Sequence, residues 1–71
     1  MKVTVRLVPG GAPTVQDLPA HATAMDAIRA AGLPPDLVVV LRAGVPLPED
    51  EPLREGDTVE LVRVVSGGSE G

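Results

Sequence analysis

Two adjacent glycines near the end of the sequence, Gly67 and Gly68, are the residues whose type and position most directly suggest chemistry. They follow TVELVRVV at 58–65, a run typical of a β-strand, and three further residues come after them. A glycine pair at this place is either a loose tail or the reactive end of a protein that is itself a substrate. The rest of the sequence has to decide between these two interpretations.

No other residues form a recognisable reactive group. The single histidine, His21, has no cysteine to join it as a metal ligand and no nucleophile motif beside it, so we interpret it as a surface residue. PGGAP at 9–13 lacks the lysine and the Ser or Thr of a phosphate-binding loop, and we interpret it as a turn. We therefore expect no catalytic residue, no metal site and no bound cofactor.

The composition limits the classes of partner. The chain has no aromatic residue on which nucleic-acid bases could stack, and its net charge of −4 disfavours binding to a phosphate backbone. No apolar run approaches the ~20 residues that span a bilayer, and the first residues lack a signal-peptide pattern. We expect a cytoplasmic monomer that contacts neither nucleic acid nor membrane. The acidic stretch at 48–57 is either a solvated loop or a docking surface for a basic partner.

Periodicity predicts the elements of the first half of the chain. Alternation over 2–8 predicts a half-buried strand, and a short edge strand at 14–18 follows the PGGAP turn. In the first strand, Val3, Val5 and Leu7 share the predicted core face. A helix is predicted from Thr23 to Ala31, because Thr23 and Asp26 suit a capping box and Gly32 suits the position after the last turn.

The second half predicts three more strands. The strand at 37–42 is apolar on both faces, so it is either covered on both sides or faces the core on one side and a partner on the other. A short edge strand is predicted at 45–47 and the last strand at 58–65. Because the helix supplies the crossover, the first and last strands can pair in parallel. This order predicts an α+β fold of the β-grasp type, a mixed sheet of four to five strands with one helix packed across it.

The chain resembles ubiquitin-like proteins over this whole domain. LPPDLVVVLRAGVPL at 33–47 is similar to the ubiquitin stretch in which a proline pair ends the helix and leads into the third strand and an Ala-Gly turn. REGDTVELVRVVSGG at 54–68 is similar to the ending shared by ubiquitin and the bacterial and archaeal sulfur carriers. RAGVPLPEDEPLREGD at 42–57 also resembles the small archaeal modifiers and the carriers of thiamine, molybdopterin and tRNA-thiolation pathways. The resemblance covers 1–65, and 66–71 is interpreted as a flexible tail.

The resemblance implies how the diglycine reacts. An E1-like enzyme adenylates the C-terminal glycine with ATP, and the acyl group then becomes a thiocarboxylate or an isopeptide bond to a lysine. Gly68 would supply the carbonyl group, and Gly67 would let the backbone pass through a narrow channel. Because Ser69, Glu70 and Gly71 follow, a protease must first cut after Gly68, unless these three residues stay attached. The alternative is a non-conjugating interaction module with a flexible glycine tail.

The resemblance also implies a partner surface on the open face of the sheet near the tail. Leu41, Val62 and Val64 are expected to gather there, with Arg42 at its margin. The implied partners are the E1-like enzyme, a trimming protease, and either sulfur-transferring enzymes or target-protein lysines. The one lysine, Lys2, and the N-terminal amine are the acceptors available for self-conjugation, which favours a carrier or a single tag over long chains.

Overall fold

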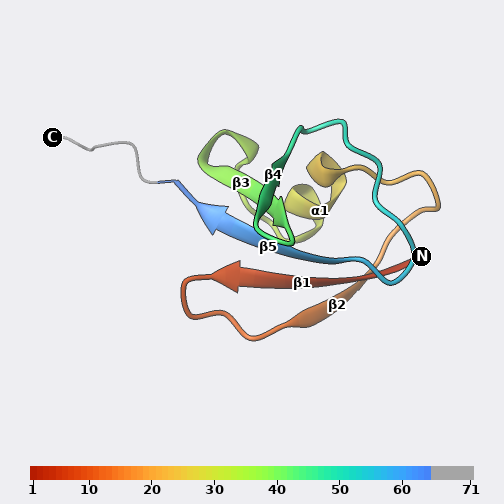
Figure 1. Ribbon diagram of the computed structural model, residues 1–71, viewed down its shortest axis with the longest axis horizontal. Coiled ribbons are helices and arrows are strands. Elements are labelled where there is room, and N and C mark those ends of the chain that lie inside the picture. The colour runs from red at the N-terminus through yellow and green to blue at the C-terminus, as the bar shows by residue number, and fades with distance from the viewer. Residues whose placement is uncertain (65–71) are drawn as a thin grey trace, which may run out of the picture.

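A single mixed sheet forms the frame of the protein (Figure 1). The structure, a computed structural model, describes residues 1–64, so the predicted tail at 66–71 lies outside it. Its elements are β1 (Lys2–Val8), β2 (Thr14–Asp17), α1 (Ala24–Ala30), the 3-10 turn η1 (Pro35–Leu37), β3 (Val38–Arg42), β4 (Val45–Leu47) and β5 (Thr58–Arg63). The order across the sheet is β2-β1-β5-β3-β4. The β-grasp architecture predicted from the sequence is confirmed.

The two central strands, β1 and β5, run parallel and are neighbours, as predicted. Their register pairs Val5 with Val59 and Leu7 with Leu61. The strands beside them, β2 and β3, are both antiparallel to their neighbours, and β4 closes the other edge. The parallel pair is possible because α1 and the strands between carry the chain back to the starting end of the sheet.

The helix begins and ends where the sequence predicts. The Thr23 amide donates to Asp26 Oδ2 at 2.8 Å, which is one half of a capping box. At the other end, the amide of Gly32 donates to the carbonyl of Arg29, and that of Leu33 donates to Ile28. This is a Schellman ending, and Gly32 adopts the positive φ of 74° that such an ending requires.

The loop between β4 and β5 closes the N-terminal end of α1. The first free amides of the helix, those of Ala24 and Met25, donate to the carbonyls of Glu51 and Glu49 at 3.0 and 2.9 Å. Leu53 from the same loop is buried, and its amide donates to Ala22. The acidic loop is therefore packed against the helix through its backbone, although its sequence gave no periodic signal.

The core lies between the sheet and α1 and is built from small aliphatic side chains. Its buried members are Val3, Val5, Leu18, Ala22, Ala24, Ala27, Ile28, Val38, Val40, Leu53, Val59 and Leu61. Three of these are alanines on or next to α1, which let the helix approach the sheet closely. Leu7 was expected in the core with Val3 and Val5, but it is 38% exposed. It lines a surface hollow with Val8, Pro9 and Arg63 instead.

The turn between β3 and β4 contains a backbone conformation that L-residues avoid. Ala43 has a φ of 53° and Gly44 a φ of 79°, so both central residues of this two-residue hairpin lie in the left-handed region. Glycine adopts this region freely, whereas for alanine this conformation costs about 1–2 kcal/mol of free energy. The backbone strain of this hairpin is therefore located at Ala43.

We predict that Ala43→Gly stabilises the protein by about 0.5–1 kcal/mol, because relief of left-handed strain exceeds the added entropy of the unfolded chain. Chemical denaturation measures this free energy of unfolding. The matched control is Ala30→Gly at an exposed helix position, which should destabilise by about 1 kcal/mol. Equal destabilisation by both substitutions would show that the turn carries no strain at Ala43.

Candidate functional site

One face of the sheet is covered by α1 and the other is open, and apolar side chains gather on the open face. They are Val8 of β1, Val39 and Leu41 of β3, Val62 of β5 and Val64 after it, which we call the open-face cluster. The registers Val8–Val62 and Val39–Val62 place three of these valines in one row across three strands. Val39 is 37% exposed and Val64 is 43% exposed.

The cluster explains why the alternation of the third strand fails. Val38 and Val40 point into the core, whereas Val39 and Leu41 point to the open face. The structure places Leu41, Val62 and Val64 on the same face of the sheet, with Leu41 opposite Glu60 in the middle of β5 and the two valines at the end of that strand. It adds Val8 and Val39, which the sequence signalled only as apolar residues out of phase with the core positions.

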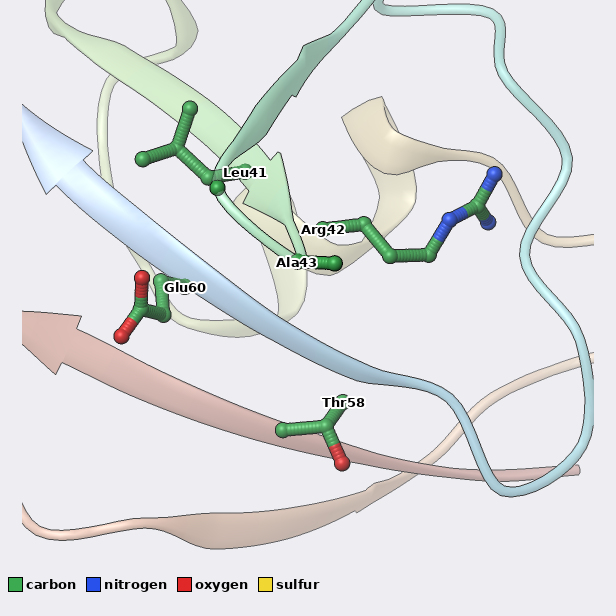
Figure 2. A pocket seen from close by; sticks show the side chains of 6 residues that line it. Leu41, Arg42, Ala43, Thr58 and Glu60 are labelled. Carbon is green, nitrogen blue, oxygen red and sulfur yellow. The ribbon is translucent and has the colours of Figure 1, made fainter.

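Charged and polar groups border the cluster on one side. Arg6 Nη1 of β1 lies 3.8 Å from Glu60 Oε2 of β5, and both side chains are partly exposed. Beyond this pair is an open hollow of about 480 Å³ lined by Leu41, Arg42, Ala43, Gly44, Thr58 and Glu60 (Figure 2). The open face is therefore apolar beside the end of β5 and polar beside the start of β5.

Arg42 lines this hollow, but its charged group does not point toward the open-face cluster, at whose margin the sequence analysis expected it. Its guanidinium group reaches away from Leu41 and Glu60 (Figure 2). There Nη1 donates to Asp57 Oδ2 at 3.1 Å, and Nη2 donates to Glu51 Oε2 at 3.2 Å. The same Asp57 carboxylate also accepts the backbone amide of Arg54 at 2.8 Å. Arg42 therefore ties the end of β3 to the acidic loop, because its strand position has the parity of the core face rather than of the open face.

The remaining predicted positions lie apart from the cluster. His21 is exposed in the turn before α1, and residues 1–64 contain no group of three His, Cys, Asp or Glu side chains that could hold a metal ion. Within the same range, neither helix is long and apolar enough to cross a membrane. Lys2 begins β1, at the end of the sheet remote from Val64.

The predicted reactive residues follow the open-face cluster along the chain. Because β5 runs parallel to β1, its last residues lie beside Val8. The amide of Val64 donates a hydrogen bond of 2.7 Å to the carbonyl of Leu37, the residue before β3. Gly67, Gly68 and the extension Ser69, Glu70 and Gly71 lie outside the described residues. The chain thus leaves the sheet at the apolar end of the open face, three residues before Gly67.

Comparisons with known proteins identify what this arrangement is similar to. The family model of small archaeal modifier protein 2 matches residues 1–65. A ubiquitin from Caldiarchaeum subterraneum is 26% identical, with a TM-score of 0.71 over 96% of this chain and 98% of that one. SAMP1 from Haloferax volcanii is also 26% identical, with a TM-score of 0.70 over 96% of this chain and all of that one. No curated protein matches the sequence.

We predict that Arg42→Met lowers the free energy of unfolding by about 1–2 kcal/mol, because it removes two charge-assisted hydrogen bonds that anchor the acidic loop. Urea denaturation measures the change. The control is Arg63→Met, since Arg63 is exposed and makes no ion pair among residues 1–64; its effect should stay within about 0.5 kcal/mol. Equal effects of the two substitutions would contradict an anchoring role for Arg42.

Proposed function

The chain belongs to the small archaeal modifier protein 2 family, and from that premise we propose that Gly68 is its reacting end. The protein is a ubiquitin-like modifier or sulfur carrier, a substrate of other enzymes rather than an enzyme. The observation that carries the proposal is the position of the diglycine, which follows the last strand of the β-grasp sheet after only a few residues.

The proposed reaction sequence begins with a protease that removes Ser69, Glu70 and Gly71. A carboxylate is a poor acyl donor until one oxygen becomes part of a leaving group. An E1-like enzyme achieves this when the Gly68 carboxylate attacks the α-phosphate of ATP, which forms the acyl adenylate and releases pyrophosphate. AMP then leaves as the acyl group passes either to sulfide-level sulfur, as a thiocarboxylate, or to a lysine amine of a target protein, as an isopeptide bond. These steps take place in the cytoplasm in this proposal.

The open-face cluster is proposed as the surface to which the activating enzyme binds. Its apolar side chains end where the tail begins, so an enzyme bound there has the reactive end within reach of its nucleotide site. Among residues 1–64, the side chains offer the enzyme an apolar row across three strands and the Arg6–Glu60 pair as an orienting contact. An apolar contact supplies affinity and a bordering charge pair supplies orientation.

The experiment that tests the reacting end is the mass of the intact protein from its native host. We predict loss of residues 69–71, followed by either replacement of one oxygen by sulfur or attachment to other proteins. After trypsin cuts at Arg63, attachment leaves the remnant VVSGG on the acceptor lysine. Gly68→Val should abolish both products. A full-length, unmodified chain under all growth conditions would instead support a binding module with a flexible tail.

A second prediction concerns the open-face cluster. Val39→Asp should lower kcat/KM for adenylation by the E1-like enzyme at least about tenfold, because a buried valine contact contributes roughly 1.5–3 kcal/mol. Pyrophosphate exchange measures this step. Val15→Asp is the matched control, since Val15 lies on the same face but on edge strand β2 and is 63% exposed. A loss of similar size in both variants would exclude the cluster as the specific contact.

A further inference from the structure

Strands β1 and β5 end side by side (Figure 1), and a second surface hollow lies at their ends. It has a volume of about 370 Å³ and is lined by Leu7, Val8, Pro9 and Arg63; we call it the Leu7 hollow. Leu7 has the strand parity of Val5, which is buried, yet it is 38% exposed. A single exposed leucine is common on protein surfaces, so the shape and the charge of the hollow decide what it can bind.

The shape of the Leu7 hollow is fixed by the turn that follows β1. The amide of Gly11 donates to the carbonyl of Leu7 at 2.9 Å, which folds the turn back against the end of the strand. A Cβ atom on Gly11 would lie 2.6 Å from Leu7 Cβ and 2.7 Å from the Leu7 carbonyl oxygen, so only glycine fits at this contact. Because the turn is already held in place, little free energy is lost in ordering it when a ligand binds.

The charge of the Leu7 hollow comes from Arg63, the last residue of β5. Its side chain is exposed and forms no ion pair with a carboxylate of residues 1–64. The other lining residues, Leu7, Val8 and Pro9, carry apolar side chains. An arginine beside an apolar wall favours a ligand that joins an apolar group to a carboxylate, because guanidinium–carboxylate hydrogen bonds are charge-assisted and directional.

The Leu7 hollow is continuous with the open-face cluster. Val8 lines the hollow and also belongs to the cluster, where it is paired with Val62 of β5. Leu7 and Val8 are successive residues of one strand, so their side chains point to opposite faces of the sheet. A protein that binds the cluster therefore reaches the hollow around the end of β1. Arg63 is also five residues before Gly68, which is at most about 18 Å along an extended chain.

We propose that the E1-like enzyme that binds the open-face cluster also inserts an apolar side chain with an adjoining carboxylate into the Leu7 hollow, and that Arg63 determines this specificity. The proposal rests on the proposed function, since it assigns a second contact to the same enzyme. Leu7 and Pro9 contact the apolar side chain, and the guanidinium group of Arg63 binds the carboxylate. Two contacts on opposite faces of the sheet restrict the orientation of the protein on the enzyme.

The first experiment tests the ligand chemistry without any enzyme. The full-length protein is titrated with isocaproate, which joins a leucine-like side chain to a carboxylate, and its NMR signals are followed. The signals of Leu7, Val8 and Arg63 should shift together with a dissociation constant of about 1–20 mM, as expected for so small a ligand. The uncharged isocaproamide should bind at least about fivefold more weakly, because it cannot form the charge-assisted hydrogen bonds.

Two variants decide whether these shifts report binding in the Leu7 hollow. Arg63→Gln should weaken isocaproate binding at least about fivefold, to the affinity of the amide, whereas Arg29→Gln should leave it unchanged. Arg29 is the matched control, because it is an exposed arginine of α1 that forms no ion pair among residues 1–64. The proposed ligand chemistry would be overturned by no binding to wild type, by equal affinity for acid and amide, or by equal losses in the two variants.

The second experiment measures activation of Gly68 by the E1-like enzyme of the host in the pyrophosphate-exchange assay. Arg63→Glu should raise KM at least about tenfold and change kcat less than about twofold, because the contact is made on binding and the reversed charge repels the enzyme's carboxylate. Arg63→Lys keeps the charge and should recover most of the affinity. Arg29→Glu changes the net charge by the same amount and should raise KM less than about twofold.

Arg63 is exposed, so its variants should fold as the wild type does, which circular dichroism checks. Similar KM values for Arg63→Glu and Arg29→Glu, or a loss confined to kcat, would overturn the second contact.

Failure of the proposed function has a different signature. If the enzyme activates neither wild type nor any variant, activation of Gly68 is contradicted, and the assignment of the Leu7 hollow to that enzyme is contradicted with it. If wild type and Arg63→Glu are activated equally well, only the second contact is contradicted. The isocaproate titration decides the ligand chemistry of the hollow in both cases.

Discussion

Helix α1 packs on one face of the five-stranded sheet and leaves the other face open, and most other features follow from this arrangement. The covered face holds the whole core among residues 1–64, and its alanines bring α1 close to the strands. The other face has no element of the described chain over it. Its apolar valines are therefore available to a partner, and the central strand that carries one of them, β5, precedes the proposed reacting residue, Gly68, in the sequence.

The acidic loop has an internal role that its composition conceals. Its carbonyls accept the first free amides of α1, and its Glu51 and Asp57 carboxylates hold Arg42. Backbone polar groups at a helix end must find partners when they are removed from water, and this loop supplies them. The solvated-loop interpretation and the docking-surface interpretation both overlooked this packing, because they considered only the charges.

In the proposed function, other enzymes recognise the folded sheet and act on the C-terminal residues, so these two parts must be separate. The parallel pair of β1 and β5 supplies this separation here, since it places the start of β1 and the end of β5 at opposite ends of the sheet. Lys2 thereby lies at the end of the sheet remote from Val64, and most of the open-face cluster lies at the same end as Val64. The same strand pairing thus places the proposed recognition surface at the end of the sheet where β5 ends.

The sequence by itself determined the elements, because their signals are local. Alternation marks the strands, Thr23, Asp26 and Gly32 bound the helix, and the failed alternation at 37–42 revealed a two-faced strand. The direction of Arg42, the hydrogen bond from the Met1 amine to Leu18 and the exposure of Leu7 depended on the tertiary structure. Each of these depends on segments distant in sequence: the Arg42 guanidinium donates to Asp57, the Met1 amine donates to Leu18, and Leu7 lines a surface hollow with Arg63. Periodicity predicts the face on which a side chain lies, whereas the residues that it contacts on that face depend on the tertiary packing.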